Sequence, residues 1–568
     1  MFVSSKGQVS KIIIEGEGLQ IDSYPIGDLM NLGKTPITID VLASMLQNYP
    51  TKIDKLILAE GFLVGFNVGY EGPRIPTNCR NLASTYIHEN PLEQKLIKKL
   101  KLGRIAGPFS YRSLENLRIS PIGLVPKKSG VWRLMHNLSY PLGNSVNSHI
   151  DPECNTVQYT SFDKVLDTIS DCGPLSLMGR MDISSAFRLF IINLGEFELF
   201  GFKFKDNCYF DKCLPMCCSA SCQLFEKNAT FLEWSVKNRS RNAPIEHYLD
   251  DFFFVGKANS LECKGLMSVF STVCDELGVP LAAEKTIGPA TVIIFLGLEI
   301  DTKEMVVRIL MEKITETKEK LVFVLNSKKV TLRTLQSLIG LLNFCARAIP
   351  PVRAFNRRFC DATCGVKKPD HFIRVSVGMK EDITVWLKFL DEFNGSRKFG
   401  KNVWLSNEQL NLYTDSSGSA NLGCGVYFCG RWAYFPWPFE WHFCDIMLDM
   451  TCLELVPILL AIFLFKNNLV NKQIIFHTDN SSLVSVLNNK SSKSKRVMQL
   501  IRPLVLKTML FNLQWKSSHI EGRNNCVADA ISHKQWARFR SLVPDADLFP
   551  IPISQEFQRL ISGLKLGD

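Results

Sequence analysis

The feature that most constrains the fold is the stretch from Glu246 to Gly256, EHYLDDFFFVG, which sets two adjacent aspartates among aromatic and β-branched residues. This composition is typical of two buried strands joined by a tight turn. A charge buried in an apolar interior is costly, so an unpaired carboxylate there requires a positive partner. Alternatively, both side chains lie in water at the turn, where aspartate is common. Taken alone, the stretch favours this second interpretation.

A third aspartate favours the interpretation that the hairpin acids have a positive partner. The segment LSLMGRMDISSAFRLFIIN, residues 175 to 193, predicts a strand that ends near Asp182. A sheet that brings this strand end to the hairpin tip joins Asp182, Asp250 and Asp251 in one patch. Mg²⁺ takes hard oxygen ligands at about 2.0 to 2.1 Å, and two such ions hold both oxygens of an in-line phosphoryl transfer. The three acids therefore predict a divalent-metal site that neutralises the hairpin charges.

The same residues resemble those of a known family. Tyr248-Leu249-Asp250-Asp251 matches the Y-x-D-D box of reverse transcriptases, and Asp182 to Phe187, DISSAF, resembles their first catalytic motif. PKKSGVWRL lies upstream, LPMCCSASCQLF between, and AAEKT and FLGLEI downstream, in the family's order. The resemblance covers roughly residues 100 to 300 and implies a right-hand polymerase with fingers, palm and thumb.

The resemblance also implies roles for individual residues. Asp182 and Asp250 would be the principal metal ligands, with Asp251 supporting them and the carbonyl of Ile183 contributing. The residues expected to contact the incoming triphosphate are Lys127 or its neighbour Lys128, and Arg133. The residues expected to form the turn that grips the primer end are Phe295, Leu296 and Gly297.

Three further positions have competing interpretations. Phe187 would stack beneath the sugar and reject a 2′-hydroxyl, unless it is an ordinary core aromatic. Lys285 would lie near the leaving pyrophosphate as a proton donor, unless it is a solvated lysine. Cys217 lies where the family usually has glycine. Its thiol either crowds the site and impairs this copy, or the neighbouring residues leave room for it.

A second set of acids follows in the C-terminal part. From about Asn411 the pattern predicts three strands, a helix around Glu454, the strand KQIIFHTDN and a further helix, an order that resembles the ribonuclease H fold. Gly423 and Gly425 fit that family's G-x-G strand. The acids that match the family's D-E-D-D set are Asp415, Glu454, Asp479 and Asp529. The resemblance implies that they hold two Mg²⁺ ions across the scissile phosphate of RNA paired to DNA.

His519 precedes Asp529 by ten residues, in SSHIEGRNNCVAD. The ribonuclease H family places a mobile histidine at this position, which helps product leave. A lone histidine is otherwise a surface residue. Its place in H-x-x-G-x-x-N favours the catalytic role.

Charge and cysteine content indicate the partners and the compartment. The formal net charge is +11, and residues 303 to 374 hold 15 Lys or Arg against 6 Asp or Glu, which suits a thumb lying on a phosphate backbone. The N-terminus lacks an apolar signal segment, so the 18 cysteines are expected to be reduced thiols and the protein intracellular, in cytoplasm or nucleus, and not secreted. The apolar run LELVPILLAIFLF has 13 residues, too few to span a bilayer, and suits a buried helix.

These patterns predict a multidomain chain of mixed α+β and α/β structure, a right-hand polymerase followed by a ribonuclease H-like domain. The expected regions are a small, mostly helical N-terminal region (1–95), fingers and palm (96–300), a basic thumb-like region (301–375), a connection (376–408), a ribonuclease H-like domain (409–540) and a C-terminal tail (541–568).

The amino-acid sequences of the motifs are most similar to those of DIRS-type retrotransposons, which carry a tyrosine recombinase. The expected function is RNA- and DNA-templated DNA synthesis with ribonuclease H cleavage, using two Mg²⁺ ions per active site, or Mn²⁺ in their place. The expected partners are an RNA template, a DNA primer, RNA–DNA hybrid, deoxynucleoside triphosphates and element-encoded recombinase and capsid-like proteins, with no membrane. Two alternatives remain: a catalytically silent nucleic-acid-binding derivative, which Cys217 favours, and a nuclease alone.

Overall fold

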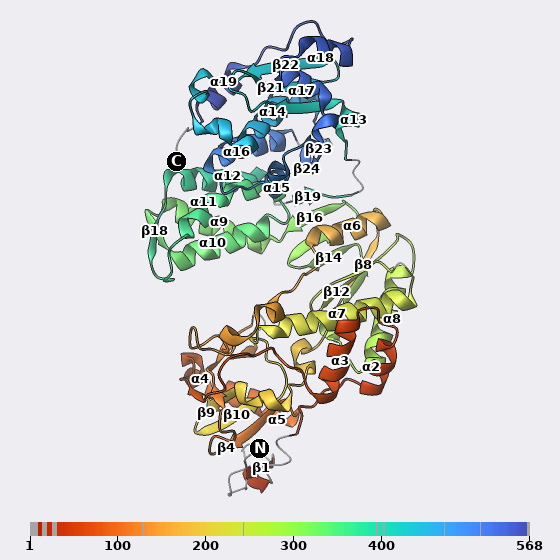
Figure 1. Ribbon diagram of the computed structural model, residues 1–568. Helices are drawn as coiled ribbons and strands as arrows, with labels where there is room; N and C mark the ends of the chain where they lie inside the picture. The colour runs from red at the N-terminus through yellow and green to blue at the C-terminus, as the bar shows by residue number, and fades with distance from the viewer. Residues whose placement is uncertain are drawn as a thin grey trace. The chain divides into compact units, whose positions relative to one another are not determined.

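The computed structural model describes residues 9–13, 20–24, 31–127, 130–241, 243–392, 396–400, 404–470, 472–511 and 513–564. Its contacts divide the chain into two compact units, Met1–Phe295 (unit 1) and Leu296–Asp568 (unit 2). Figure 1 shows that each unit contains both helices and strands, which confirms the predicted class of a multidomain α+β and α/β chain. The six expected regions have narrower limits than these units and stay predictions.

The centre of unit 1 is a four-stranded sheet in the order β11-β12-β8-β13. Its strands are β11 (Ile245–Tyr248), β12 (Asp251–Gly256), β8 (Leu177–Asp182) and β13 (Ile287–Ala290). Helices α7 (Ala220–Arg239) and α8 (Glu262–Leu277) pack on these strands, as Figure 1 shows. The aromatic side chains of Phe252 and Phe254 are fully buried. The predicted hairpin and the predicted strand ending near Asp182 are both confirmed.

A second sheet of unit 1 has the order β3-β5-β9-β10-β4. Its strands are β3 (Thr77–Asn78), β5 (Arg118–Ile119), β9 (Gly201–Phe204), β10 (Asn207–Asp211) and β4 (Ile105–Phe109). Beside it lies the antiparallel hairpin of β6 (Ile122–Pro126) and β7 (Trp132–His136).

The N-terminal residues of unit 1 share its main core. The described elements are the paired strands β1 (Val9–Ile13) and β2 (Gln20–Tyr24), followed by the helices α2 (Ile39–Leu46), α3 (Lys52–Val64), α4 (Ala83–Ile87) and α5 (Glu89–Lys101). Leu46 and Phe62 belong to the same apolar cluster as Phe252 of the central sheet. Helices α2 and α3 are therefore packed against the core of the central sheet, whereas Leu92 and Leu96 of α5 belong to a second apolar cluster.

The segment 292–300 forms two strands rather than one continuous strand. β14 (Val292–Phe295) and β15 (Leu298–Asp301) are separated by Leu296 and Gly297. Both separating residues have positive φ, 49° and 82°, a conformation that breaks an extended strand. A turn therefore exists where the family resemblance implies one.

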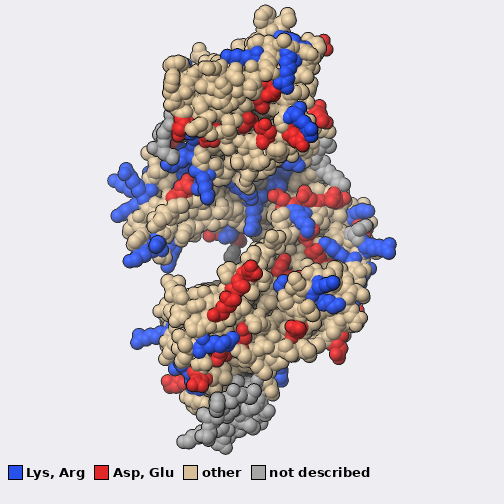
Figure 2. Space-filling view, viewed as in Figure 1, with Lys and Arg blue, Asp and Glu red and all other residues tan. Residues whose placement is uncertain are grey.

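Unit 2 begins with a small antiparallel sheet, which a group of helices follows. β15 pairs with β16 (Val306–Ile309), and β16 with β19 (Ser396–Lys398). The helices that follow β16 are α9 (Met311–Asn326), α10 (Leu332–Cys345), α11 (Arg357–Thr363) and α12 (Val377–Glu392). On the face drawn in Figure 2, Lys and Arg side chains gather over these helices, in the part of the sequence predicted to be basic.

The rest of unit 2 has the predicted βββαβα order. β20 (Leu412–Ser416), β21 (Gly423–Phe428) and β22 (Arg431–Pro436) are antiparallel neighbours. The helix α14 (Met450–Phe465) follows, and β23 (Gln473–Thr478) pairs in parallel with β24 (Gln514–His519). The remaining helices are α15 (Ser481–Asn489), α16 (Lys495–Leu510) and α17 (Cys526–Ser532).

The apolar helix α14 is longer than its 13-residue apolar run suggests. Among the described residues, one helical segment, Met450–Asn468, is long and apolar enough to cross a membrane by length and composition alone. Residues on both sides of the 13-residue run extend the helix to this length, and the predicted buried helix is present. The share of its apolar window buried inside the protein is 67%, and α14 packs on β20, β21 and α16, as expected for a core helix.

The segment expected as a C-terminal tail packs against β22. The Trp432 indole donates to the carbonyl of Asp547 at 2.7 Å, and the backbone N–H of Ile551 donates to the carbonyl of Trp432. Phe557, in α19 (Gln555–Ser562), is fully buried. This segment therefore packs on the sheet of β20, β21 and β22.

Candidate functional site

The first candidate site lies at one end of the central sheet of unit 1. Antiparallel pairing of β12 with β8 makes Asp251 the direct partner of Asp182. The backbone N–H of Ile183 donates to the carbonyl of Asp250 at 3.1 Å. The sheet therefore brings together the three acids that the sequence predicted as one patch, which we call the hairpin site.

The turn that carries these acids has an unusual backbone. Tyr248 and Asp251 pair across a two-residue turn formed by Leu249 and Asp250, and Leu249 has a φ of 53°. A left-handed conformation costs a non-glycine residue roughly 1 to 2 kcal/mol, and such outliers cluster at functional sites. The strained turn presents Asp250 at the sheet end.

Two cations bind two of the three hairpin acids, Asp182 and Asp251. The Lys285 amine donates to Asp182 Oδ1 at 2.7 Å, and Arg180 binds Asp251 Oδ1 through Nε at 2.9 Å and Nη2 at 2.8 Å. Burial and the charge of Asp182 raise the pKa of Asp250. Burial also raises the pKa of Asp251, opposed by Arg180. The positive partners that the buried charges require are thus side chains of the chain itself.

Sequence reasoning missed Arg180. It lies two residues before Asp182 on β8, so its side chain points to the same face of the strand, and a period-2 pattern could have identified it. Lys285 was predicted to lie near the leaving pyrophosphate, and this stays a prediction; in the structure its amine donates to Asp182.

The residues expected to bind nucleotide come from separate segments of unit 1. Lys127 and Arg133 belong to the β6–β7 hairpin and are exposed. Arg133 Nη1 lies 3.6 Å from the sulfur of Met216, so the hairpin reaches the segment that contains Cys217. Lys128 lies outside the described residues.

Phe187 lies in a short 3-10 helix, η3 (Ala186–Leu189), directly after the β8 strand end. Its ring packs edge to face on Phe225, with centroids 5.6 Å apart, and it is only partly buried. The ring is therefore both packed on the core and accessible, so the geometry is compatible with either interpretation.

The structure accommodates the side chain of Cys217. Positive φ values occur at several described non-glycine residues, and Cys217 is not one of them. Its carbonyl accepts a hydrogen bond from Asn147 Nδ2 at 2.8 Å, and burial raises the pKa of its thiol. The backbone here does not require glycine. As the sequence predicted, the neighbouring Cys213, Cys218 and Cys222 are free thiols too.

The expected primer-grip residues lie at the turn after β14. Phe295 is fully buried and its ring centroid is 4.7 Å from that of Phe253 on β12. A side chain at Gly297 would lie 3.0 Å from the Phe344 ring, so space as well as φ favours glycine there.

The second candidate site, the four-acid site, lies in unit 2. Asp415 is on β20, Glu454 on α14, Asp479 directly follows β23, and Asp529 is on α17. Close packing of α17 on β21 is made possible by Gly425, where a Cβ would lie 2.7 Å from Ile531. Asp415 and Glu454 are buried, whereas Asp479 is exposed.

Neutral donors hold these buried acids. Ser532 donates to Asp415 Oδ2 at 2.6 Å, and Ser416 donates to Glu454 Oε1 at 3.0 Å. Burial and the charges of Asp529 and Asp479, opposed by the hydrogen bond from Ser532, raise the pKa of Asp415 to about 6. Burial and the charge of Asp415 raise the pKa of Glu454 well above its ordinary value. The buried Asp415 and Glu454 thus repel each other and are bound by neutral hydroxyl groups, whereas the cation at this site, Arg538, binds Asp529.

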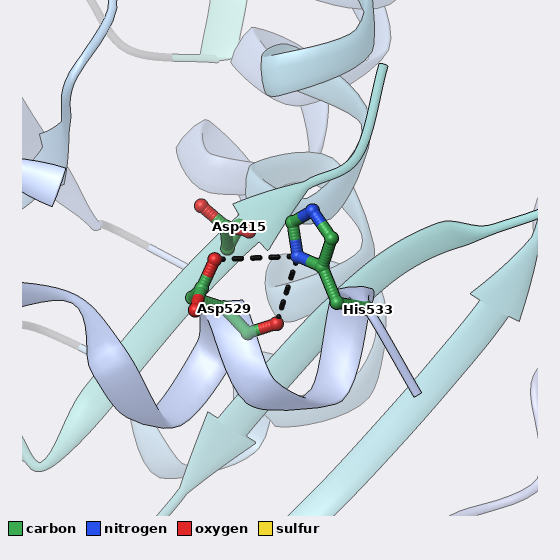
Figure 3. A group of neighbouring side chains, drawn as sticks. All are labelled: Asp415, Asp529 and His533. Atoms are coloured by element: carbon green, nitrogen blue, oxygen red, sulfur yellow. Dashed lines mark hydrogen bonds and ion pairs between the residues drawn. The ribbon is translucent and has the colours of Figure 1, made fainter. Parts of the chain in front are cut away.

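A histidine absent from the sequence prediction completes a possible metal-binding group. Figure 3 shows His533 beside Asp529 on α17, facing Asp415 on β20. His533 Nδ1 lies 3.2 Å from Asp529 Oδ1, and one donor atom from each of the three residues lies within 4.8 Å of the others. Among the residues that the structure describes, this is the group of three donors close enough to hold one ion. The spacing of His533, four residues after Asp529 on a helix, could have revealed it.

Two further side chains contact acids of this site outside the group of three donors. His519 Nε2 lies 3.1 Å from the carbonyl oxygen of Asp479, and its side chain is exposed. Arg538 binds Asp529 Oδ2 at 2.6 Å. Oxygen and imidazole donors around repelling carboxylates fit a divalent cation in chemical type.

The chain is similar to solved structures of foamy viral protease-reverse transcriptase. The structure titled as the dRH form in complex with ds DNA has 15% identity and a TM-score of 0.45, over 84% of this chain and 81% of that one. A complex with RNA/DNA hybrid has 16% identity and a TM-score of 0.45, over 91% and 64%. A complex with dsDNA has 16% identity and a TM-score of 0.45, over 86% and 98%. No protein-family model matches the chain, and no curated protein matches it significantly.

Proposed function

We propose that the chain is a reverse transcriptase, which synthesises DNA on RNA and DNA templates by two-metal phosphoryl transfer and cleaves RNA in RNA–DNA hybrids at a ribonuclease H site. The observation that carries the proposal is the pairing of Asp182 with Asp251, which joins two motifs far apart in the sequence at one sheet end. A Y-x-D-D turn beside a second strand-end aspartate supports metal-dependent chemistry on phosphates.

In the proposed polymerase reaction, Asp182 and Asp250 hold the ions, and Arg180 orients Asp251. Mg²⁺, or Mn²⁺, supplies the charge that stabilises the attacking and leaving oxygens. Lys285, which neutralises Asp182 in the structure, moves to the leaving pyrophosphate and donates a proton or a hydrogen bond there. Lys127, Lys128 and Arg133 bind the triphosphate, Phe187 excludes the 2′-hydroxyl, and Phe295, Leu296 and Gly297 hold the primer end.

In the proposed ribonuclease reaction, Asp415, Glu454, Asp479 and Asp529 hold the ions at the hybrid, and His519 assists product release. The exposure of His519 and its contact with the Asp479 backbone support a side chain free to move. The partners are accordingly RNA template, DNA primer, hybrid and deoxynucleoside triphosphates. The basic helices from α9 to α11 suit the duplex backbone.

The element type is also a proposal. The segments GFLVGFNVGYEGP, NLRISPIGLVPKK and CSASCQLFEKNATFLEW support a DIRS-type retrotransposon, whose recombinase and capsid-like proteins would be partners inside the cell. Free thiols in unit 1 suit a reducing compartment, cytoplasmic or nuclear.

Primer extension on an RNA template with deoxynucleotides and Mg²⁺ tests the polymerase proposal. Wild-type protein should extend the primer and Asp250→Asn should not. Cleavage of labelled RNA in a hybrid, with Asp479→Asn as its control, tests the second activity. Extension by neither protein would contradict the polymerase assignment.

A nuclease without polymerase activity is the second candidate. It is favoured by one observation: the described donors close enough to hold one ion lie in unit 2, whereas cationic side chains bind the hairpin acids. Hybrid cleavage without primer extension would select this candidate. A silent binding protein would show neither activity and still retain the hybrid.

A further inference from the structure

One buried acid of unit 1 has no role in the proposed chemistry. Asp211, the last residue of β10, has an exposed fraction of 1%. His136 Nδ1 lies 2.8 Å from Asp211 Oδ2, and the Arg188 guanidinium donates to Oδ1. The backbone N–H of Asp211 donates to the carbonyl of Phe200 at 3.0 Å. Both carboxylate oxygens of Asp211 therefore have a partner, and a backbone hydrogen bond fixes the residue itself.

The charge of Asp211 is strongly favoured by its surroundings. Burial opposes ionisation, but the charges of Arg188 and Lys99 and the hydrogen bond from His136 hold the pKa of Asp211 well below its usual range. Burial and the charge of Arg188 lower the pKa of Lys99 to about 7. Asp211 is thus the anion around which these cations are arranged.

Its two partners belong to the segments expected to bind nucleotide. His136 ends β7, the strand that contains Arg133, and its Nε2 lies 3.2 Å from the carbonyl oxygen of Gly201. Each ring nitrogen therefore lies within hydrogen-bond distance of an oxygen, one on Asp211 and one on the backbone of Gly201. Arg188 directly follows Phe187 in η3.

The same two partners also reach the segment of Cys217. Arg188 Nη1 donates to the carbonyl of Cys213 at 2.8 Å. A hydrogen bond to the backbone of His136 lowers the pKa of the Cys217 thiol, against the larger effect of burial. Asp211 therefore joins three segments that are separate in the sequence: the β6–β7 hairpin, the Phe187 turn and the loop after β10.

We propose that Asp211 is a positioning residue for the incoming nucleotide, which fixes the triphosphate-binding hairpin against the turn that carries Phe187. This inference rests on the proposed polymerase function. Asp211 touches no reacting atom, so its loss displaces Arg133 and Phe187 relative to each other. Misplaced binding groups weaken nucleotide affinity and sugar discrimination while leaving the metal-binding acids in place.

The experiment compares two substitutions of one partner. In His136→Asn the amide keeps a donor near the position of Nδ1, toward Asp211, whereas in His136→Gln the amide reaches the position of Nε2, toward Gly201. We expect His136→Gln to raise the apparent KM for deoxynucleotide about tenfold, with kcat within about twofold of wild type. His136→Asn should have a KM much closer to that of wild type. Incorporation of ribonucleotide relative to deoxynucleotide should rise in His136→Gln. Asp211→Asn should show the same pattern more strongly where it folds.

The matched control is Lys227→Met, which breaks an ion pair with Asp54 at 2.5 Å between α7 and α3. It should lower the melting temperature without changing the deoxynucleotide KM. Equal KM values in wild type and both His136 variants would overturn the inference while the polymerase assignment stands. A KM increase in Lys227→Met as large as that in His136→Gln would overturn it too, because the effect would then follow stability. Failure of the wild type to extend any primer overturns the polymerase assignment and this inference with it.

Discussion

The two carboxylate sites solve the same electrostatic problem in different ways. At the hairpin site, Lys285 and Arg180 bind two of the three acids directly. At the four-acid site, the buried Asp415 and Glu454 are held by hydroxyl groups, and the pKa of both is raised. At the hairpin site cations bind the acids at the sheet end, whereas at the four-acid site Arg538 binds only Asp529. Asp415 and Glu454 keep a mutual repulsion that a bound cation would relieve.

This difference predicts that a bound cation affects stability differently in the two units. A carboxylate with a fixed cationic partner is satisfied before substrate arrives, but the cation must move for an ion to bind both oxygens. Carboxylates that repel one another destabilise the empty site and bind an incoming cation strongly. The hairpin site should therefore depend on Mg²⁺ for activity, and the four-acid site for activity and for stability.

The largest expected effect is the separate loss of the two activities. Asp250→Asn should lower primer extension by about a hundredfold to a thousandfold, because an acid near the reacting phosphate is lost, and hybrid cleavage should persist. Asp479→Asn should do the reverse. Extension rates and cleavage rates on one protein preparation measure both effects. Loss of both activities in either variant would mean that the two sites are not independent.

A smaller effect is expected from pH, at a buried cation–carboxylate group in the same unit as the hairpin site. His247 lies on β11 between Glu226 and Glu233, with Nε2 at 3.1 Å from Glu226 Oε1. Burial lowers the pKa of His247, but hydrogen bonds to Glu226 and Glu233 and their charges raise it to about 9. Its protonation thus stabilises unit 1 fully below pH 6.5, and the effect is lost as pH rises through 9.

The expected loss of unfolding free energy is about 3 kcal/mol, from the pKa difference between folded and unfolded states. Chemical denaturation between pH 6.5 and pH 10, followed by fluorescence, measures this loss. His247→Gln should flatten the pH dependence in this range. An unchanged slope in that variant would mean that another group titrates.

The metal dependence of stability tests the comparison most directly. Mg²⁺ at a hundred times its dissociation constant adds about 2.7 kcal/mol to the stability of the form that binds it. We expect the melting transition of unit 2 to rise with Mg²⁺ and that of unit 1 to rise less, because Lys285 and Arg180 already neutralise the hairpin acids. Differential scanning calorimetry with and without chelator measures both transitions. Asp415→Asn should abolish the shift in unit 2, and equal shifts in both units would contradict the comparison.

Local patterns in the sequence predicted more of the acids than of their partners. Asp182, Asp250 and Asp251 follow strand and turn signals, and the four acids of unit 2 follow strand and helix order, so their places could be predicted. Arg180, His533 and Asp211 were missed, because what defines them is a contact across the fold. The break between β14 and β15 does not follow from the apolar pattern, because φ at Leu296 is set by the turn rather than by its apolar side chain.

The smallest expected effect is that of Cys217→Gly. The backbone at Cys217 lies outside the positive-φ region, and the side chain is partly buried beside the backbone of His136. Glycine would remove that packing and add backbone freedom, at a cost of roughly 0.5 to 1 kcal/mol, without opening a conformation that cysteine forbids. Primer extension should therefore change less than about threefold, measured under the conditions used for Asp250→Asn. A gain of activity well beyond that would show that the thiol crowds the hairpin site, and that the cations on its acids mark an impaired copy rather than a polymerase awaiting its metal.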